Sequence, residues 1–326
     1  MKRIYLQFFV AFLIMILLTS CDNIETSKNS SVSNDRIKGT EGIIYELFDD
    51  TCARAIGYEG AETNIVIDNE YKGVPVEKIH IGAFKDSKIE SVTIPDSVVS
   101  IYSGAFSDCR YLKEVILSNN LTYIDSQVFK GCSSLTTISF ESIESYSLKI
   151  GYEAFKDCTS LQNMNLSTVT EIGENCFSGC SKLKTVILPN GISKIGKFTF
   201  YGCESLEQVD IPHGVTTIEH SAFGNCNSLK QVLMPNTVIA IEDSAFYFCY
   251  NLTDIIIPKS VLNIGYNAFG NCNRLKNITF ENPIGWKAYW GDYQRVQIPS
   301  NGNLSNGSIA AEYLARDYYN CKWTCS

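Results

Sequence analysis

The sequence predicts a β-rich repeat solenoid: nine repeats of about 23 residues, with parallel strands, short helical turns and a cap at each end. Three observations predict it. A phenylalanine recurs every 22 or 23 residues, with one step of 26; an isoleucine lies five residues before each; and a cysteine lies three residues after it in eight of nine copies. The phenylalanines are Phe84, Phe106, Phe129, Phe155, Phe177, Phe200, Phe223, Phe246 and Phe269. A unit this short cannot bury its own apolar face, so it must stack on its neighbours.

Each repeat contains two predicted strands and one predicted turn. The pattern Leu-x-x-Val-x-Ile-Pro, as in residues 206–212, alternates apolar and polar residues and ends at a proline, which is typical of a strand. The pattern Val-x-x-Ile, as in residues 215–218, predicts a second extended segment after a turn. The Ala-Phe-x-x-Cys segment has a spacing closer to helical, and we expect a short helical turn that places the phenylalanine in the core.

Two copies depart from the repeat pattern. Residues 141–147 add length and lack the proline, so we expect them to bulge from the stack. The first copy has Ser87 where the others have cysteine. Neither change breaks the register of the phenylalanine ladder. Residues 79–281 are therefore predicted to form one continuous repeat domain.

The N-terminus has the pattern of an export signal. Lys2 and Arg3 precede fifteen largely apolar residues, a stretch shorter than the ~20 residues that a membrane span needs. The sequence Leu-Thr-Ser-Cys at residues 18–21 resembles the bacterial lipobox, so we predict a lipoprotein signal peptide over residues 1–20 and a lipid anchor at Cys21. The alternative is an ordinary cleaved signal with Cys21 incidental. Residues 21–39 are rich in Ser, Asn, Lys and Asp and predict a flexible tether.

Both ends of the repeat domain need a cap, because an open solenoid end exposes core and strand edge. In the N-terminal cap, residues 40–78, two β-prone segments flank a polar turn at Asp49 and Asp50 and predict a hairpin. In the C-terminal cap, residues 282–326, we expect a short helix with Ser308 as its N-cap. Trp286 and Trp290 could stack on carbohydrate, but covering the exposed core is the favoured interpretation.

The chain has 13 cysteines, and eight of them form one ladder at a fixed place in the repeat. We expect these ladder cysteines to be free, buried thiols, although adjacent rungs ~4.8 Å apart are close enough for disulfides. Cys321 and Cys325 are the favoured disulfide pair. No Cys-x-x-Cys pair or Cys/His cluster with zinc spacing occurs, so no metal site and no cofactor are predicted.

The repeat unit Leu-x-x-Val-x-Ile-Pro-x-x-Val-x-x-Ile-Gly-x-x-Ala-Phe-x-x-Cys resembles the BspA-like leucine-rich repeats of bacterial surface antigens. The resemblance runs from about Gly42 to the C-terminus and includes the tyrosine-rich tail. It implies a curved solenoid of the leucine-rich-repeat type, surface display, and adhesion to host matrix, host cells or other microbes. The family has no shared catalytic residues that could be carried over.

Catalysis and nucleic-acid binding are disfavoured. The three histidines, His80, His213 and His220, occupy variable repeat positions and lie near no catalytic signature. The formal net charge of −8 becomes −10 when Lys2 and Arg3 are removed with the signal, and no Lys/Arg cluster offers a phosphate-binding surface. We therefore expect neither an enzyme nor a nucleic-acid partner.

Two surfaces are candidates for partner binding. In Leu-x-x-Val-x-Ile the residues on either side of Val point outward, and some of these are aliphatic in the C-terminal half. This candidate partner surface comprises Thr185, Ile187, Gln208, Asp210, Gln231, Leu233, Asp254 and Ile256. The candidate aromatic patch comprises Tyr201, Tyr247, Phe248 and Tyr250. The alternatives are β-propensity alone for the first surface and packing between adjacent loops for the second.

These patterns together predict an exported, lipid-anchored recognition or adhesion module at the bacterial surface. Its expected partners are a protein or glycan ligand of host or microbial origin and the membrane, reached through the lipid anchor. A different class of function, an envelope scaffold that organises the bacterium's own surface proteins, stays open. An enzyme is the third alternative.

Overall fold

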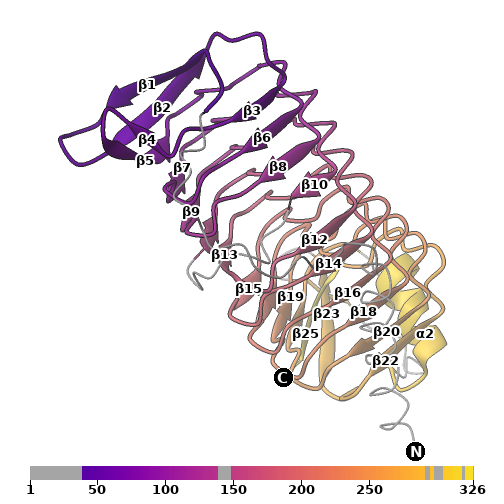
Figure 1. Cartoon of the computed structure of the whole chain (residues 1–326). Coiled ribbons are helices and arrows are strands. Elements are labelled where there is room, and N and C mark those ends of the chain that lie inside the picture. The colour runs from indigo at the N-terminus through magenta and orange to yellow at the C-terminus, as the bar shows by residue number, and fades with distance from the viewer. Residues whose placement is uncertain (1–38, 139–147, 291–293, 297–303, 318–319, 326) are drawn as a thin grey trace, which may run out of the picture. The chain divides into compact units, whose positions relative to one another are not determined.

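The computed structural model describes residues 39–138, 148–290, 294–296, 304–317 and 320–325 (Figure 1). The predicted signal peptide, the predicted lipid anchor Cys21, the tether before residue 39 and the segment 141–147 lie outside the described residues.

The first strand of each repeat pairs in parallel with its equivalent in an adjacent repeat (Figure 1). Val209 lies beside Val232, for example, and Ile255 beside Ile278. Because the pairing keeps the repeat register, every inward-facing residue stacks on its own equivalent. A short preceding strand, β3 (Asn64–Val66), begins this series. The others are β6 (Ser91–Thr93), β8 (Glu114–Ile116), β10 (Thr137–Ile138), β12 (Asn163–Asn165), β14 (Thr185–Ile187), β16 (Gln208–Asp210), β18 (Gln231–Leu233), β20 (Asp254–Ile257) and β22 (Asn277–Phe280).

The second strands form another parallel series, which confirms the predicted solenoid. Ile218 pairs with Ile195 on one side and with Ile241 on the other. These residues are buried, as the Val-x-x-Ile pattern predicts. The strands are β5 (Val74–Ile79), β7 (Ser100–Ile101), β9 (Tyr123–Ile124), β11 (Leu148–Ile150), β13 (Val169–Ile172), β15 (Lys194–Ile195), β17 (Thr217–Ile218), β19 (Ala240–Ile241) and β21 (Asn263–Ile264).

The segment around each core phenylalanine is a run of tight turns, where the sequence predicted a short helical turn. Backbone amides bond three residues back, as Gly224 N to Ser221 O at 3.1 Å. Alternate amides bond to the next repeat, as Phe223 N to Ala245 O at 2.8 Å. These inter-repeat bonds replace the bonds of a helix and hold the segments in register. We call the residues from two before to two after each core phenylalanine, across all nine repeats, the turn column.

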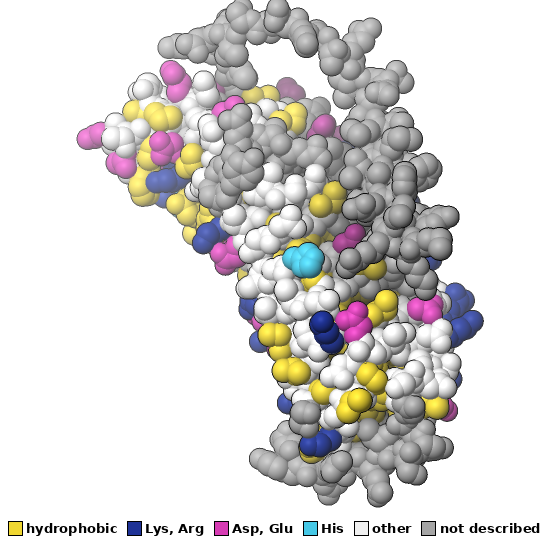
Figure 2. Space-filling model, turned by 90° about the horizontal axis from the view of Figure 1, so that it is seen from below, with side chains coloured by type: hydrophobic (Ala, Val, Ile, Leu, Met, Phe, Trp, Pro, Cys, Tyr) yellow, Lys and Arg dark blue, Asp and Glu magenta, His cyan; other side chains and the backbone are white. Residues whose placement is uncertain are grey.

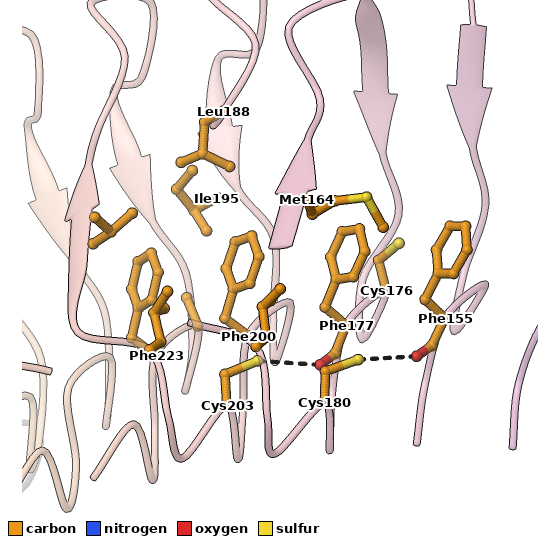
Figure 3. Packing of buried hydrophobic residues seen from close by; sticks show 14 of the residues in the cluster. Phe155, Met164, Cys176, Phe177, Cys180, Leu188, Ile195, Phe200, Cys203 and Phe223 are labelled. Carbon is orange, nitrogen blue, oxygen red and sulfur yellow. Dashed lines mark hydrogen bonds between the residues drawn. The ribbon is translucent and has the colours of Figure 1, made fainter. Parts of the chain in front are cut away.

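The core is a continuous stack of the nine phenylalanines, all buried, with successive ring centroids 4.9 to 5.6 Å apart. Each ladder cysteine donates its thiol to the backbone carbonyl of the phenylalanine one repeat back, at 3.0 to 3.3 Å. Figure 3 shows the Cys180 and Cys203 thiols directed at the carbonyl oxygens of Phe155 and Phe177. The ladder cysteines are free and buried, as predicted, and burial raises the pKa of thiols such as Cys203.

The N-terminal cap is the predicted hairpin. Strands β1 (Ile43–Leu47) and β2 (Ala53–Tyr58) pair antiparallel, and β2 then continues the second strand series by pairing in parallel with β5. A short strand, β4 (Glu70–Tyr71), pairs antiparallel with β5. The Tyr58 ring lies 6.2 Å from the ring of Phe84, so the hairpin covers the first phenylalanine of the stack.

The C-terminal cap contains strands that the sequence did not predict. β25 (Lys322–Cys325) pairs antiparallel with β21 and with β23 (Trp286–Trp290), which in turn pairs with β24 (Gln294–Val296). Trp323 is fully buried, and together with Leu314 it lines a small gap beside Phe269, the last ring of the stack. Trp286 is also buried and packs edge-on against Phe280, in line with the expected capping role. The Trp290 side chain lies outside the described part of the chain.

The predicted N-cap of the C-terminal helix was wrong by two residues. The helix α2 (Gly307–Glu312) has Asn306 as its N-cap, because the Asn306 side chain accepts hydrogen bonds from the first turn, including that of Ser308 N. A single π-helical turn, Tyr313–Asp317, follows it.

Cys321 and Cys325 are both free, which corrects the predicted disulfide. Cys321 directly precedes β25 and Cys325 ends it, so about four extended residues at ~3.3 Å each separate them, which is beyond the reach of a disulfide. The Cys325 thiol donates instead to the carbonyl oxygen of Ile284 at 3.3 Å.

Candidate partner-binding surfaces

The outer face of the first strand series carries exposed aliphatic side chains in the C-terminal half. Ile187, Leu233 and Ile256 are 46%, 37% and 56% exposed. Their chain neighbours Val232 and Ile255 are buried, since side chains alternate across a strand. The sequence therefore assigned the direction of these side chains correctly.

Several polar members of the candidate partner surface have hydrogen-bond partners, either within the surface or on a neighbouring repeat. Thr185, Asp210, Gln231 and Asp254 are exposed and Gln208 is half-buried. Gln208 donates to Asp210 at 3.0 Å, while hydrogen bonds from Asn277 and Thr253 lower the pKa of Asp254. The exposed aliphatic side chains are thus accompanied on this face by neutral and acidic side chains, of which Gln208 and Asp210 bond to one another.

Three of the four residues of the candidate aromatic patch are in contact. The rings of Tyr247 and Phe248 lie 4.1 Å apart, and those of Phe248 and Tyr250 lie 5.4 Å apart, each pair tilted by about 45°. Tyr250 is 38% exposed and the other two are half-buried. Tyr201 lies two repeats earlier, in the same place relative to its core phenylalanine as Tyr247.

The structure adds Phe198, which sequence reasoning missed. Its ring packs edge-on against Tyr201 at 5.7 Å and against His220 at 4.9 Å. We call Phe198, Tyr201, Tyr247, Phe248 and Tyr250 the aromatic surface. On the face of the molecule in Figure 2, hydrophobic side chains lie in small groups between polar and charged ones.

Each of the two half-buried tyrosines is fixed by the repeat that follows it. Asn225 Nδ2 donates to Tyr201 Oη at 2.8 Å, and Asn271 Nδ2 donates to Tyr247 Oη at 3.0 Å. A Cβ added to Gly224 would lie 3.0 Å from the Tyr201 ring, so this ring rests directly on backbone. The expected packing between adjacent loops is therefore present, and it orients the rings.

The turn column needs left-handed backbone two residues before and two after each core phenylalanine, and Phe198 and Phe248 occupy such positions with φ of 54° and 61°. A bulky side chain there costs about 1–2 kcal/mol. In the other repeats these positions hold glycine or polar residues. Before the phenylalanine they are Gly82, Gly104, Gln127, Glu153, Asn175, Ser221, Ser244 and Asn267; after it they are Asp86, Asp108, Gly131, Asp157, Gly179, Gly202, Asn225 and Asn271.

The described residues contain no group of three or more His, Cys, Asp or Glu side chains that could hold a metal ion. In the same part of the chain, no helix is both long enough and apolar enough to cross a membrane. The histidine nearest the aromatic surface, His220, contacts Phe198, and its backbone amide donates to Glu242 at 3.1 Å. The surfaces thus offer ring faces, aliphatic groups and hydrogen-bonding groups.

The chain is similar to solved structures of bacterial leucine-rich repeat proteins, and the Bacteroides ovatus protein among them supports the fold. The chain is 24% identical to a leucine-rich repeat protein from Bacteroides ovatus, with a TM-score of 0.63, covering 75% of this chain and 71% of that one. It is 24% identical to a leucine-rich repeat protein of T. pallidum, with a TM-score of 0.48 and coverage of 76% and 91%. A leucine-rich cell surface protein from Faecalibacterium prausnitzii is 23% identical, with a TM-score of 0.46 and coverage of 77% and 96%.

The repeats themselves match a known family model. No curated protein is a significant match to the chain. The model of the BspA type leucine-rich repeat region matches residues 77–206 and 193–289, which together make up more than half of the chain. The period, the phenylalanine stack and the cysteine ladder all fall within these residues, and the chain therefore belongs to the BspA-type leucine-rich repeat family.

Proposed function

We propose that this protein is a lipid-anchored bacterial surface protein whose solenoid recognises protein partners as an adhesion module. The repeat family suggests a protein-interaction role of the surface type. The basic and apolar N-terminus and the Leu-Thr-Ser-Cys sequence before the tether support export and attachment through Cys21.

The row of exposed aliphatic side chains on the first strand series carries the proposal. Leu233 and Ile256 belong to adjacent repeats and project from the same face, with Ile187 two repeats before Leu233. Exposed apolar groups with a polar rim are typical of a protein-binding surface. The partner would contact this face across several repeats, a surface larger than a single loop could provide.

The chain supplies a matched control for this surface. Ile239 and Leu262 come from the same two adjacent repeats and are 44% and 46% exposed, but they lie beside the second strand series. The test compares the full-length double variant Leu233→Asp/Ile256→Asp with Ile239→Asp/Leu262→Asp. Binding is measured to purified extracellular-matrix proteins and to fixed cells of the producing bacterium. We expect the first variant alone to lose binding, by tenfold or more.

Equal loss in both double variants, or none in either, would contradict the proposed surface. Capture only by the producer's own envelope would favour the scaffold alternative. Protease treatment of intact cells checks display, and Cys21→Ala checks anchoring. We expect the wild-type chain to be cleaved on intact cells and the Cys21→Ala chain to be released from the membrane. A chain protected until the cells are lysed would overturn surface display.

A further inference from the structure

Two phenylalanines of the aromatic surface occupy backbone positions that disfavour them. At both places the chain uses asparagine in other repeats, Asn225 and Asn271 for Phe248, and Asn175 and Asn267 for Phe198. Asparagine adopts left-handed backbone readily, whereas phenylalanine does so only with strain. The rings are also only partly buried, so the core does not require them. Strained residues of this kind cluster at ligand-binding sites.

We propose that the aromatic surface binds a proline-rich segment of a partner protein in the polyproline II conformation. This inference rests on the proposed recognition function but uses a different surface from Leu233 and Ile256.

The spacing of the two equivalent tyrosines fits such a ligand. Tyr201 and Tyr247 occupy the same repeat position two repeats apart. Parallel strands are ~4.8 Å apart, so equivalent atoms in these repeats are separated by about 9.6 Å along the stack. A polyproline II helix advances ~3.1 Å per residue with three residues per turn, or about 9.3 Å per turn. Successive prolines of a P-x-x-P segment lying along the stack would therefore meet the two rings.

The hydrogen bonding of the tyrosines fits the same ligand. Because Asn225 and Asn271 each donate to a tyrosine oxygen, the phenolic proton is directed elsewhere and can be donated. A polyproline II segment has no internal hydrogen bonds and exposes every carbonyl oxygen. Proline itself has no N–H to satisfy. A site that offers donors beside ring faces therefore matches this backbone.

The tilt of the rings favours a peptide over a sugar. Phe248 is inclined by 45° to Tyr247 and by 44° to Tyr250, so the three rings form angled walls. Because their centroids are only 4.1 and 5.4 Å apart, the rings contact one another and present faces and edges in different directions, and a compact pyrrolidine ring can pack on such a surface, as in aromatic-lined grooves that bind proline-rich segments. The flat face of a pyranose would contact only one of these rings at a time.

The experiment uses the full-length chain labelled with 3-fluorotyrosine. It is titrated with decaproline, a Gly/Ser decapeptide or chitotetraose, and the chemical shifts of the tyrosine signals are followed by fluorine NMR. Tyrosine signals are assigned with Tyr201→Phe, Tyr247→Phe, Tyr250→Phe and Tyr111→Phe variants. We expect decaproline alone to shift the signals of the tyrosines in the aromatic surface. Tyr111 is 57% exposed on an early repeat, and its signal should not move.

Phe248→Asn separates recognition from folding. It should weaken decaproline binding at least tenfold without lowering the melting temperature, because the lost ring contacts are offset by the relief of strain. A fall of several degrees in melting temperature would show that the ring has a structural role and overturn the inference. So would shifts caused by chitotetraose alone, equal shifts with the Gly/Ser peptide, or no shift at all. Loss of matrix binding only in Leu233→Asp/Ile256→Asp reports on the proposed function independently.

Discussion

The turn column of the third and fourth repeats differs from that of the sixth and eighth, although the core beneath is the same. In the earlier pair, Glu153 and Gln127 occupy the left-handed position before the phenylalanine, and Gln127 donates to Glu153 at 2.9 Å. Lys130 and Lys156 also donate to Glu153, which is almost fully buried. The earlier repeats are thus joined on their outer side by a charged network.

In the later pair, phenylalanine occupies a left-handed position, and the neighbours are tyrosine and asparagine. The spacing of the stacked core rings is the same in both regions: the ring centroids of Phe129 and Phe155 are 5.3 Å apart, and those of Phe200 and Phe223 are 5.4 Å apart. The interior therefore fixes the spacing of the repeats, while the exterior of the turn column can carry either a stabilising ion network or an exposed aromatic surface.

The largest expected effect separates inside from outside within one repeat. Phe200→Ala should reduce the free energy of unfolding by about 3–5 kcal/mol, because it leaves a cavity in the ring stack. Phe198→Asn, two residues away, should change it by less than about 1 kcal/mol, because the lost ring contacts are offset by reduced strain: asparagine adopts this left-handed backbone at the same position in other repeats. Urea denaturation followed by circular dichroism measures both. Similar losses for the two variants would erase the distinction between core and surface.

The charged network of the earlier repeats should show a pH dependence. Burial raises the pKa of Glu153, but hydrogen bonds from Lys130, Lys156 and Gln127 outweigh it and lower the pKa to about 2. Glu153 therefore contributes stability above the ordinary carboxyl pKa, and this contribution is lost as the pH falls towards 2.

Glu153→Gln should destabilise the fold by about 2–3 kcal/mol at pH 7, and the difference from wild type should shrink steadily below about pH 4.5. Glutamine is tolerated by the backbone here, since Gln127 has the same conformation. The control is Glu90→Gln, which removes an exposed ion pair with Lys113 and should cost less than about 0.5 kcal/mol. Urea titrations at several pH values measure both. A pH-independent loss would contradict the role of the Glu153 charge.

The cysteine ladder should give an intermediate effect. Cys226→Ala removes a buried thiol and its bond to the Phe200 carbonyl, so we expect a loss of about 1–2 kcal/mol. Cys325→Ala also removes a thiol bonded to a carbonyl, but at a partly exposed position near the chain end, and should cost less than about 0.5 kcal/mol. Thermal unfolding compares the two. Equal losses would mean that burial in the ladder adds nothing.

The sequence predicts whatever the period controls and little else. The recurring spacing of Phe200, Cys203 and Ile195 was sufficient to predict the ring stack, the parallel register of the strands and the free thiols. Equivalent residues are buried in every repeat, so the pattern in the sequence is strong. The carbonyl partner of each thiol was not predictable, since it lies one repeat back and depends on the path of the backbone. The left-handed backbone of Phe198 and Phe248 was missed because nothing in the sequence of their own repeats indicates it. Only a comparison with the glycine and asparagine at the equivalent positions of other repeats could have revealed it.

The C-terminal cap was predicted least well. Its strands pair antiparallel, and Trp323 is buried by contacts with a distant repeat, so no local period indicates either feature. The N-terminal hairpin was predictable because both strands and the turn between them are adjacent in sequence. The outward direction of the side chains in the candidate partner surface was also predictable, since inward and outward side chains alternate along a strand. Partner binding at that surface stays a prediction.

The smallest expected effect concerns the bond that orients the aromatic surface. Tyr201→Phe removes the oxygen that accepts from Asn225, and at this half-buried position we expect a loss of about 0.5 kcal/mol. Tyr111→Phe, in an early repeat, should cost nothing measurable. A double-mutant cycle with Asn225→Ala isolates the pair, and its coupling energy should be about 0.5 kcal/mol in the folded chain. A coupling of zero would mean that Asn225 does not direct the phenolic proton. The later turn column would then differ from the earlier one only in hydrophobicity, and the match to an acceptor-rich ligand would fail.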